Sequence, residues 1–117
     1  MSLYQSFQQA WQRFTEFEGD DEGRTVRFAE VMNLMELSCD LWIDKAVYGR
    51  SGELLEEYLC DCLALINSSP AALGHIEKLL HAGSTFARIG AFCSAHKGRL
   101  KLEAVFEELK LPRDDGP

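Results

Sequence analysis

The sequence predicts an all-α fold, a single-domain bundle of five to six helices around a long central helix at residues 25–48. Apolar residues recur at spacings of three and four along most of the chain, which is the periodicity of helices rather than strands. Short polar breaks that contain Gly or Pro separate these stretches. The stretch Thr25–Tyr48 contains neither Gly nor Pro and is apolar around most of its circumference.

This stretch is predicted to be the centre of the fold, because a helix that is apolar on most sides must be covered by other helices. At ~1.5 Å per residue it would be roughly 36 Å long, comparable with the diameter of a small domain. The acidic residues at 20–22 suit the positive end of the helix dipole, and Gly49 can take the left-handed conformation that ends a helix. Its apolar seam consists of Phe28, Met32, Met35, Cys39, Trp42 and Ala46.

A first helix is predicted from Leu3 to about Phe17. Ser2 and Gln5 form the capping-box pattern that precedes a helix. One side of the helix is rich in aromatic residues, and Tyr4 and Trp11 lie beside it. We expect the aromatic side to pack on the central helix; an exposed aromatic patch that binds a partner is the alternative.

Two further helices are predicted after the central one. The first covers Glu53–Asn67, with Ser51 as its N-cap. The second runs from Pro70 to about Ala82, because Ser69 is a good capping residue, Pro is tolerated at the first helical position and Gly83 can end the helix.

The last two helices are predicted near Ser84 to His96 and at Leu100–Leu111, where Pro112 ends the helix. The helical domain would then span residues 1–111, and residues 112–117 would form a flexible tail. One side of the fifth helix carries small residues, which predicts a close crossing with another helix. A homodimer contact through the same side is the alternative.

Charge and composition exclude several classes of protein. The 117 residues include 12 Lys and Arg against 19 Asp and Glu, a formal net charge of −7, so direct nucleic-acid binding is not predicted. No apolar run approaches the ~20 residues that span a bilayer, and no membrane association is predicted. The first residues lack a basic region followed by an apolar stretch, so no secretory signal is predicted and a cytoplasmic location is expected.

The cysteines are predicted to be buried thiols rather than disulfides, because the expected compartment is reducing. No cofactor is predicted. A metal site is the weaker alternative: Cys93 and His96 can share a helix face, and His75 or His81 would have to complete the ligand set. The cysteines are Cys39, Cys60, Cys62 and Cys93.

No catalytic motif is present, so the chain is predicted not to be an enzyme. The sequence contains no G-x-S-x-G turn, no glycine-rich phosphate loop and no H-E-x-x-H helix. A dyad assembled in space, such as Cys39 or Cys93 with His75, remains the alternative.

Acidic residues provide the candidate binding site. Glu36, Asp40 and Asp44 are four residues apart and therefore line one stripe of the central helix. We expect this stripe to face solvent; binding of a basic partner is the functional alternative. With the acidic residues of the next helix, the candidate site consists of Glu36, Asp40, Asp44, Glu56, Glu57 and Asp61.

These observations favour a non-catalytic helical protein–protein interaction module, an adaptor, regulator or inhibitor with an acidic surface and a protein partner that would be basic. A small-ligand or metal-binding bundle is one alternative, and it requires a deep polar cavity near His75, His81 or His96. An acidic mimic of nucleic acid is the other, and it requires the carboxylates to gather on one face.

Overall fold

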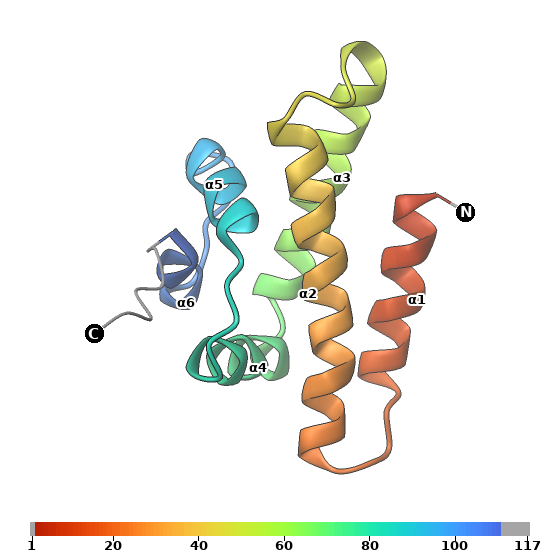
Figure 1. The fold of residues 1–117 in the computed structure, drawn as a ribbon, viewed down its shortest axis with the longest axis vertical. Helices are drawn as coiled ribbons and strands as arrows, with labels where there is room; N and C mark the ends of the chain where they lie inside the picture. Colours follow the sequence, from red (N-terminus) through yellow and green to blue (C-terminus); the bar gives the residue numbers. More distant parts are fainter. Residues whose placement is uncertain (1, 111–117) are drawn as a thin grey trace.

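The helices of the protein are arranged around α2, as the sequence predicts (Figure 1). In the computed structural model, which describes residues 2–110, α2 (Asp21–Ile43) packs against four other helices. These are α1 (Leu3–Thr15), α3 (Gly49–Asn67), α4 (Pro70–His81) and α5 (Ala87–Ala95). The predicted all-α class is confirmed.

The centre of the core is built from the predicted seam of α2. Phe28, Met32, Met35 and Cys39 are fully buried, and burying a large apolar side chain stabilises a fold by roughly 1.5–3 kcal/mol. The other helices contribute buried partners such as Leu59, Ile76, Ile89, Phe92 and Phe106. The cysteines Cys39, Cys60, Cys62 and Cys93 are buried and unbridged, as predicted.

The covering of α2 is incomplete. Leu37 of α2 is 55% exposed, and Tyr48, the last residue of the predicted central helix, lies beyond the end of α2 and is 82% exposed. Within residues 2–110, no helix combines the length and apolarity that crossing a bilayer requires.

The predicted start of α2 is four residues late, since the helix begins at Asp21 rather than Thr25. The side chain of Asp20 accepts a hydrogen bond from the Gly23 N–H at 2.8 Å, and this cap sets the first residue of the helix.

The predicted end of α2 is also wrong: the helix ends at Ile43, and Gly49 begins α3. Lys45 takes the left-handed conformation, with φ at +54°. Its N–H donates to the Trp42 carbonyl at 3.2 Å, and the Ala46 N–H donates to the Leu41 carbonyl at 3.0 Å. This pair of bonds satisfies the last carbonyls, so a lysine ends the helix where a glycine was expected.

Most of the other capping predictions are confirmed, and one is wrong. The box between Ser2 and Gln5 is present, Ser69 caps α4 through the Ala72 N–H, and Gly83 follows α4 with φ at +90°. Ser51 is not a cap, because α3 already begins at Gly49.

The C-terminal helices are shorter than predicted. α6 covers Ala104–Glu107 and continues as the 3₁₀ turn η1 (Glu108–Lys110). The side-chain amide of Asn67 donates to the Lys101 carbonyl at 3.0 Å and accepts from the Glu103 N–H at 2.9 Å, which holds the preceding segment outside the helix. Leu111, Pro112 and the predicted tail at 112–117 lie outside the described residues.

Most of the small side of α5 is not its packing side. Ile89, Phe92 and Cys93 are buried, and α5 packs on α2. On the side with small residues, Gly90 is buried, but Ala91 and Ser94 are exposed. Large residues therefore form most of the buried side of a helix for which a close crossing through small residues was predicted.

Candidate functional site

The predicted acidic stripe of α2 is largely engaged within the chain. The carboxylate of Glu36 accepts hydrogen bonds from the backbone N–H groups of Arg88, at 3.1 Å, and Ile89, at 2.8 Å. Asp40 pairs with the Arg88 guanidinium at 2.9 Å. Since α5 has no side-chain cap of its own, Glu36 supplies the negative charge that a helix N-terminus favours.

Asp44 therefore faces solvent as expected, whereas Glu36 and Asp40 are only partly exposed and bind the start of α5. Asp44 follows the last residue of α2 and is exposed. Its position at the helix end separates it from the pair that holds α5.

The three acidic residues of α3 also differ in whether they have an ion-pair partner. Glu56 faces α5 and the turn that follows it, with its carboxylate 3.2 Å from His96 Nε2 and 3.9 Å from the Arg99 guanidinium. Glu57 and Asp61 are exposed, and the described residues include no ion-pair partner for either. The six predicted site residues thus do not form one surface, and their role in binding stays a prediction.

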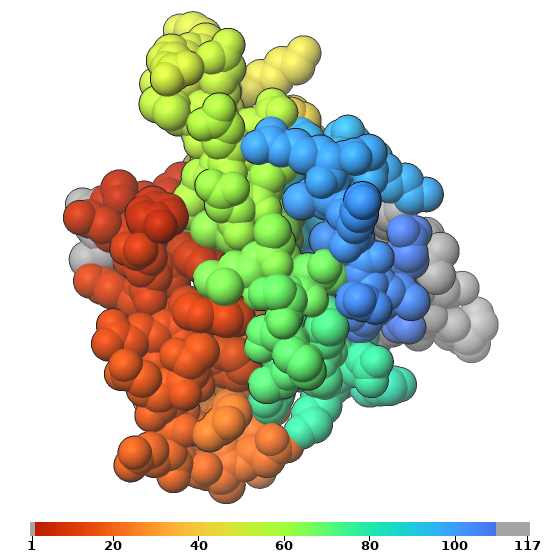
Figure 2. Space-filling model, turned by 180° about the vertical axis from the view of Figure 1, so that it is seen from behind, coloured from red at the N-terminus to blue at the C-terminus, as the bar shows by residue number. Residues whose placement is uncertain are grey.

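A groove between α1 and α3 contains the unpaired Asp61. It has a volume of about 180 Å³, and the two helices lie side by side on this face of the molecule (Figure 2). The Tyr58 hydroxyl of α3 donates a hydrogen bond to the Leu3 carbonyl of α1 at 3.0 Å, which joins the two helices. The groove is lined by Tyr4, Phe7, Gln8, Trp11, Asp61, Cys62 and Leu65.

The groove has a buried apolar floor and an exposed apolar rim. Phe7 and Cys62 are buried, whereas Tyr4 is 51% and Leu65 is 42% exposed. The Trp11 ring stacks on Phe7 with centroids 6.0 Å apart. The predicted packing of the aromatic side of α1 on α2 therefore applies to its buried part, and the remaining aromatic residues form the wall of an open groove.

Two larger hollows differ from the groove, because charged residues in their walls are already paired within the chain. One of about 380 Å³ lies between α1 and α2, and the charges of Arg13 and Glu30 in its wall pair with each other at 3.3 Å. Another of about 320 Å³ lies at the turn between α2 and α3, beside Trp42 and Glu56. Glu56 is already engaged by His96.

The residues of the alternative metal site are spread over the fold. His75 lies on α4 beside the start of α2, His81 is the exposed last residue of α4, and His96 follows α5 next to Glu56. Across the described part of the chain, no group of three or more His, Cys, Asp or Glu residues could hold a metal ion.

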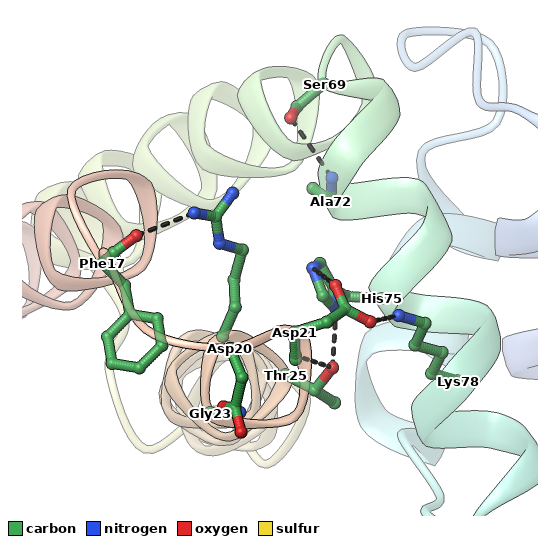
Figure 3. A network of polar contacts seen from close by, with 10 residues as sticks. Phe17, Asp20, Asp21, Gly23, Thr25, Ser69, Ala72, His75 and Lys78 are labelled. Carbon is green, nitrogen blue, oxygen red and sulfur yellow. Dashed lines mark hydrogen bonds and ion pairs between the residues drawn. The ribbon is translucent and has the colours of Figure 1, made fainter.

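His75 forms a polar network that sequence reasoning missed (Figure 3). Its Nδ1 lies 2.8 Å from the Thr25 hydroxyl, and its Nε2 lies 3.9 Å from an Asp21 carboxylate oxygen. Lys78 pairs with the other oxygen of Asp21. A hydroxyl, an imidazole and a carboxylate in this order are the components of a nucleophilic triad.

The geometry argues for a structural role instead. His75 is only 5% exposed and lies against the rings of Phe14 and Phe28, with centroids 5.5 and 6.0 Å away. Burial, and secondarily the charge of Arg24, lower the pKa of His75. The distance to Asp21 exceeds a hydrogen bond, so the network joins α4 to α2 rather than activating Thr25. The sequence could not predict this contact, because Thr25 and His75 are 50 positions apart and local residue spacing does not relate them.

Cys39, Cys60 and Cys62 do not suit nucleophilic chemistry. Burial raises the pKa of Cys62 to about 12, and it raises the pKa values of Cys39 and Cys60 as well. A thiol with a raised pKa stays protonated at neutral pH, and the thiolate is the reactive form.

Comparison with known proteins assigns the chain to no family. No protein-family model matches the chain, and neither a curated protein nor a solved structure is similar enough to match.

Proposed function

We propose that the protein is a non-catalytic helical interaction module that binds another protein in the groove between α1 and α3. The observation that carries the proposal is the combination of exposed Tyr4 and Leu65 on the rim with the unpaired carboxylate of Asp61 in the wall. Exposed apolar side chains that gather beside a pocket are typical of a protein-binding site.

The size of the groove supports a side-chain anchor rather than a small ligand. Sites for drug-sized ligands have volumes of about 300–1,000 Å³, and this groove has about 180 Å³. Binding energy at protein interfaces is concentrated in a few large residues that fill such pockets. The aromatic residues Tyr4 and Trp11 supply suitable contact area on the receiving side.

The two alternative functions have less support. A mimic of nucleic acid needs its carboxylates on one outer face, whereas Glu36, Asp40 and Glu56 are engaged with α5 and the turn after it. A ligand-binding bundle needs a deep polar cavity near a histidine. His75 is packed against aromatic rings, and in the hollow near His96 the carboxylate of Glu56 is already engaged by that histidine.

The experiment compares Leu65→Glu with Leu37→Glu. Both leucines are exposed, at 42% and 55%, but Leu37 lies on α2 and does not line the groove. Surface substitutions of this kind usually change the free energy of unfolding by no more than about 0.5 kcal/mol. Urea denaturation would verify that both variants fold.

The full chain and the two variants are used to capture proteins from an extract of the native cell, and captured proteins are identified by mass spectrometry. Calorimetry with the purified partner then measures each affinity. We expect Leu65→Glu to weaken binding by about tenfold or more, as for an interface anchor, and Leu37→Glu to leave it unchanged. Equal affinity of the wild type and Leu65→Glu would refute the proposal, as would capture of no partner.

A further inference from the structure

We propose that the partner contributes an amphipathic helix, with Lys or Arg next to its apolar anchors, and that this helix lies along the groove between α1 and α3. This inference rests on the proposed function and specifies its partner class. Three features of the groove carry it: its direction, its volume and its charge.

The direction of the groove suits a helix. α1 and α3 both run opposite to α2, and therefore run the same way as each other (Figure 1). The wall on α1 is formed by Tyr4, Gln8 and Trp11, at spacings of four and three, so it extends over two helical turns. On α3, Asp61 and Leu65 are one turn apart. A partner helix would present anchors at matching intervals along such a groove.

The volume suits one large side chain at a time. An engineered cavity of ~150 Å³ holds a benzene molecule, and the groove measures about 180 Å³. A leucine or phenylalanine side chain on the partner helix therefore has the right size to reach the floor formed by Phe7 and Cys62.

The charge of the groove selects a basic occupant. The charged residue in the lining of the groove is Asp61. Glu57, one turn earlier on α3, does not line the groove, but it adds a like charge at a spacing that destabilises a helix by a few tenths of a kcal/mol. Elsewhere on α3, Glu53 pairs with Arg50, and Glu56 pairs with His96 and Arg99. No Lys or Arg lines the groove. A cation on the partner would relieve the repulsion that the chain itself leaves in place.

The same charges disfavour a second copy of this chain as the occupant. Each copy carries a formal net charge of −7 over the whole chain, and like-charged molecules repel one another as they associate. A basic helix is instead attracted at long range by the acidic protein.

The test is a selection from a displayed library of amphipathic helical peptides, with the full wild-type chain as bait. All peptides share one leucine stripe, and the flanking positions are randomised. We expect Lys and Arg to be enriched beside the stripe. The best selected peptide, made synthetically, should bind Leu65→Glu at least about tenfold more weakly than wild type and Asp61→Asn about two- to fivefold more weakly.

Glu77→Gln is the matched control, since Glu77 is an exposed carboxylate on α4 that does not line the groove, and the peptide should bind this variant as tightly as wild type. Several results would overturn the inference: no enriched peptide, enrichment of neutral or acidic flanks, or equal affinity for Leu65→Glu. A wild-type dimer in sedimentation that Leu65→Glu dissociates would assign the groove to a second copy.

The two proposals fail in different ways. A captured native partner that depends on Leu65 but binds through no basic helix overturns only this inference. A captured partner that binds Leu65→Glu with the same affinity as wild type overturns the proposed function of the groove.

Discussion

Two regions of the molecule contain carboxylates and aromatic rings: the boundary between α2 and α5, and the groove between α1 and α3. The carboxylates are paired and a ring is buried at the boundary, whereas in the groove a carboxylate is unpaired within residues 2–110 and a ring is exposed. At the first boundary, Glu36 and Asp40 are bonded to the start of α5, and Phe92 is fully buried against Trp42, with ring centroids 5.0 Å apart. In the groove, Asp61 has no ion-pair partner among the described residues and Tyr4 is half exposed.

The difference shows that residue type alone does not separate structural from binding residues. A carboxylate that faces a helix N-terminus or a guanidinium stabilises the fold. The carboxylate of Asp61, which faces an open groove, has no ion-pair partner among residues 2–110. The acidic residues of this chain therefore have two kinds of surroundings that their spacing in sequence does not distinguish.

The largest expected effect is at the closed boundary. Phe92→Ala should lower the free energy of unfolding by about 3–5 kcal/mol, because it leaves a cavity beneath Trp42 and His96. Tyr4→Ala, at the open groove, should cost less than about 1 kcal/mol, since only part of the ring is buried. Urea denaturation measures both, and similar costs for the two variants would contradict the comparison.

An intermediate effect is expected for the carboxylates. Glu36→Ala should lower the free energy of unfolding by about 1–2 kcal/mol, since it removes the cap of α5. Asp61→Ala should stay within about 0.5 kcal/mol of wild type. The urea midpoints of the two variants measure this difference. If Asp61→Ala costs as much as Glu36→Ala, the carboxylate of Asp61 has a structural partner after all.

A smaller, pH-dependent effect on the free energy of unfolding is expected where α2 meets α4. His75, a titratable residue, is buried at this boundary. The pKa of His75 is lowered in the fold, by burial and then by Arg24, while Lys78 engages the nearby Asp21. The unfolded chain therefore binds the proton more readily. The contribution of neutral His75 is complete above the unfolded pKa of about 6.5 and is lost as pH falls through the folded pKa.

Urea unfolding between about pH 5 and 8 would measure this slope. His75→Gln should flatten it, and His81→Gln, on the same helix but exposed, is the control for removing a histidine. An unchanged slope in His75→Gln would assign the pH dependence to other groups.

The sequence by itself determined the fold class, the existence and order of the helices, and the caps formed by Ser2 and Ser69. These features depend on residues within one or two turns of each other, so apolar spacing and capping chemistry reveal them. The same local reasoning identified four buried residues of the α2 seam, Phe28, Met32, Met35 and Cys39, and the aromatic side of α1. It was wrong for Ala46, which lies beyond the end of the helix and is exposed.

Only the tertiary structure decided what the polar residues do. Glu36 meets the N–H groups of α5 across 52 and 53 positions, and Thr25 meets His75 across 50. Asn67 shortens the last helix through backbone groups more than thirty positions later. Contacts at such separations leave no periodic signal, because they depend on how packed helices are placed in space. For the same reason, the groove that leaves Asp61 unpaired exists only in the folded chain.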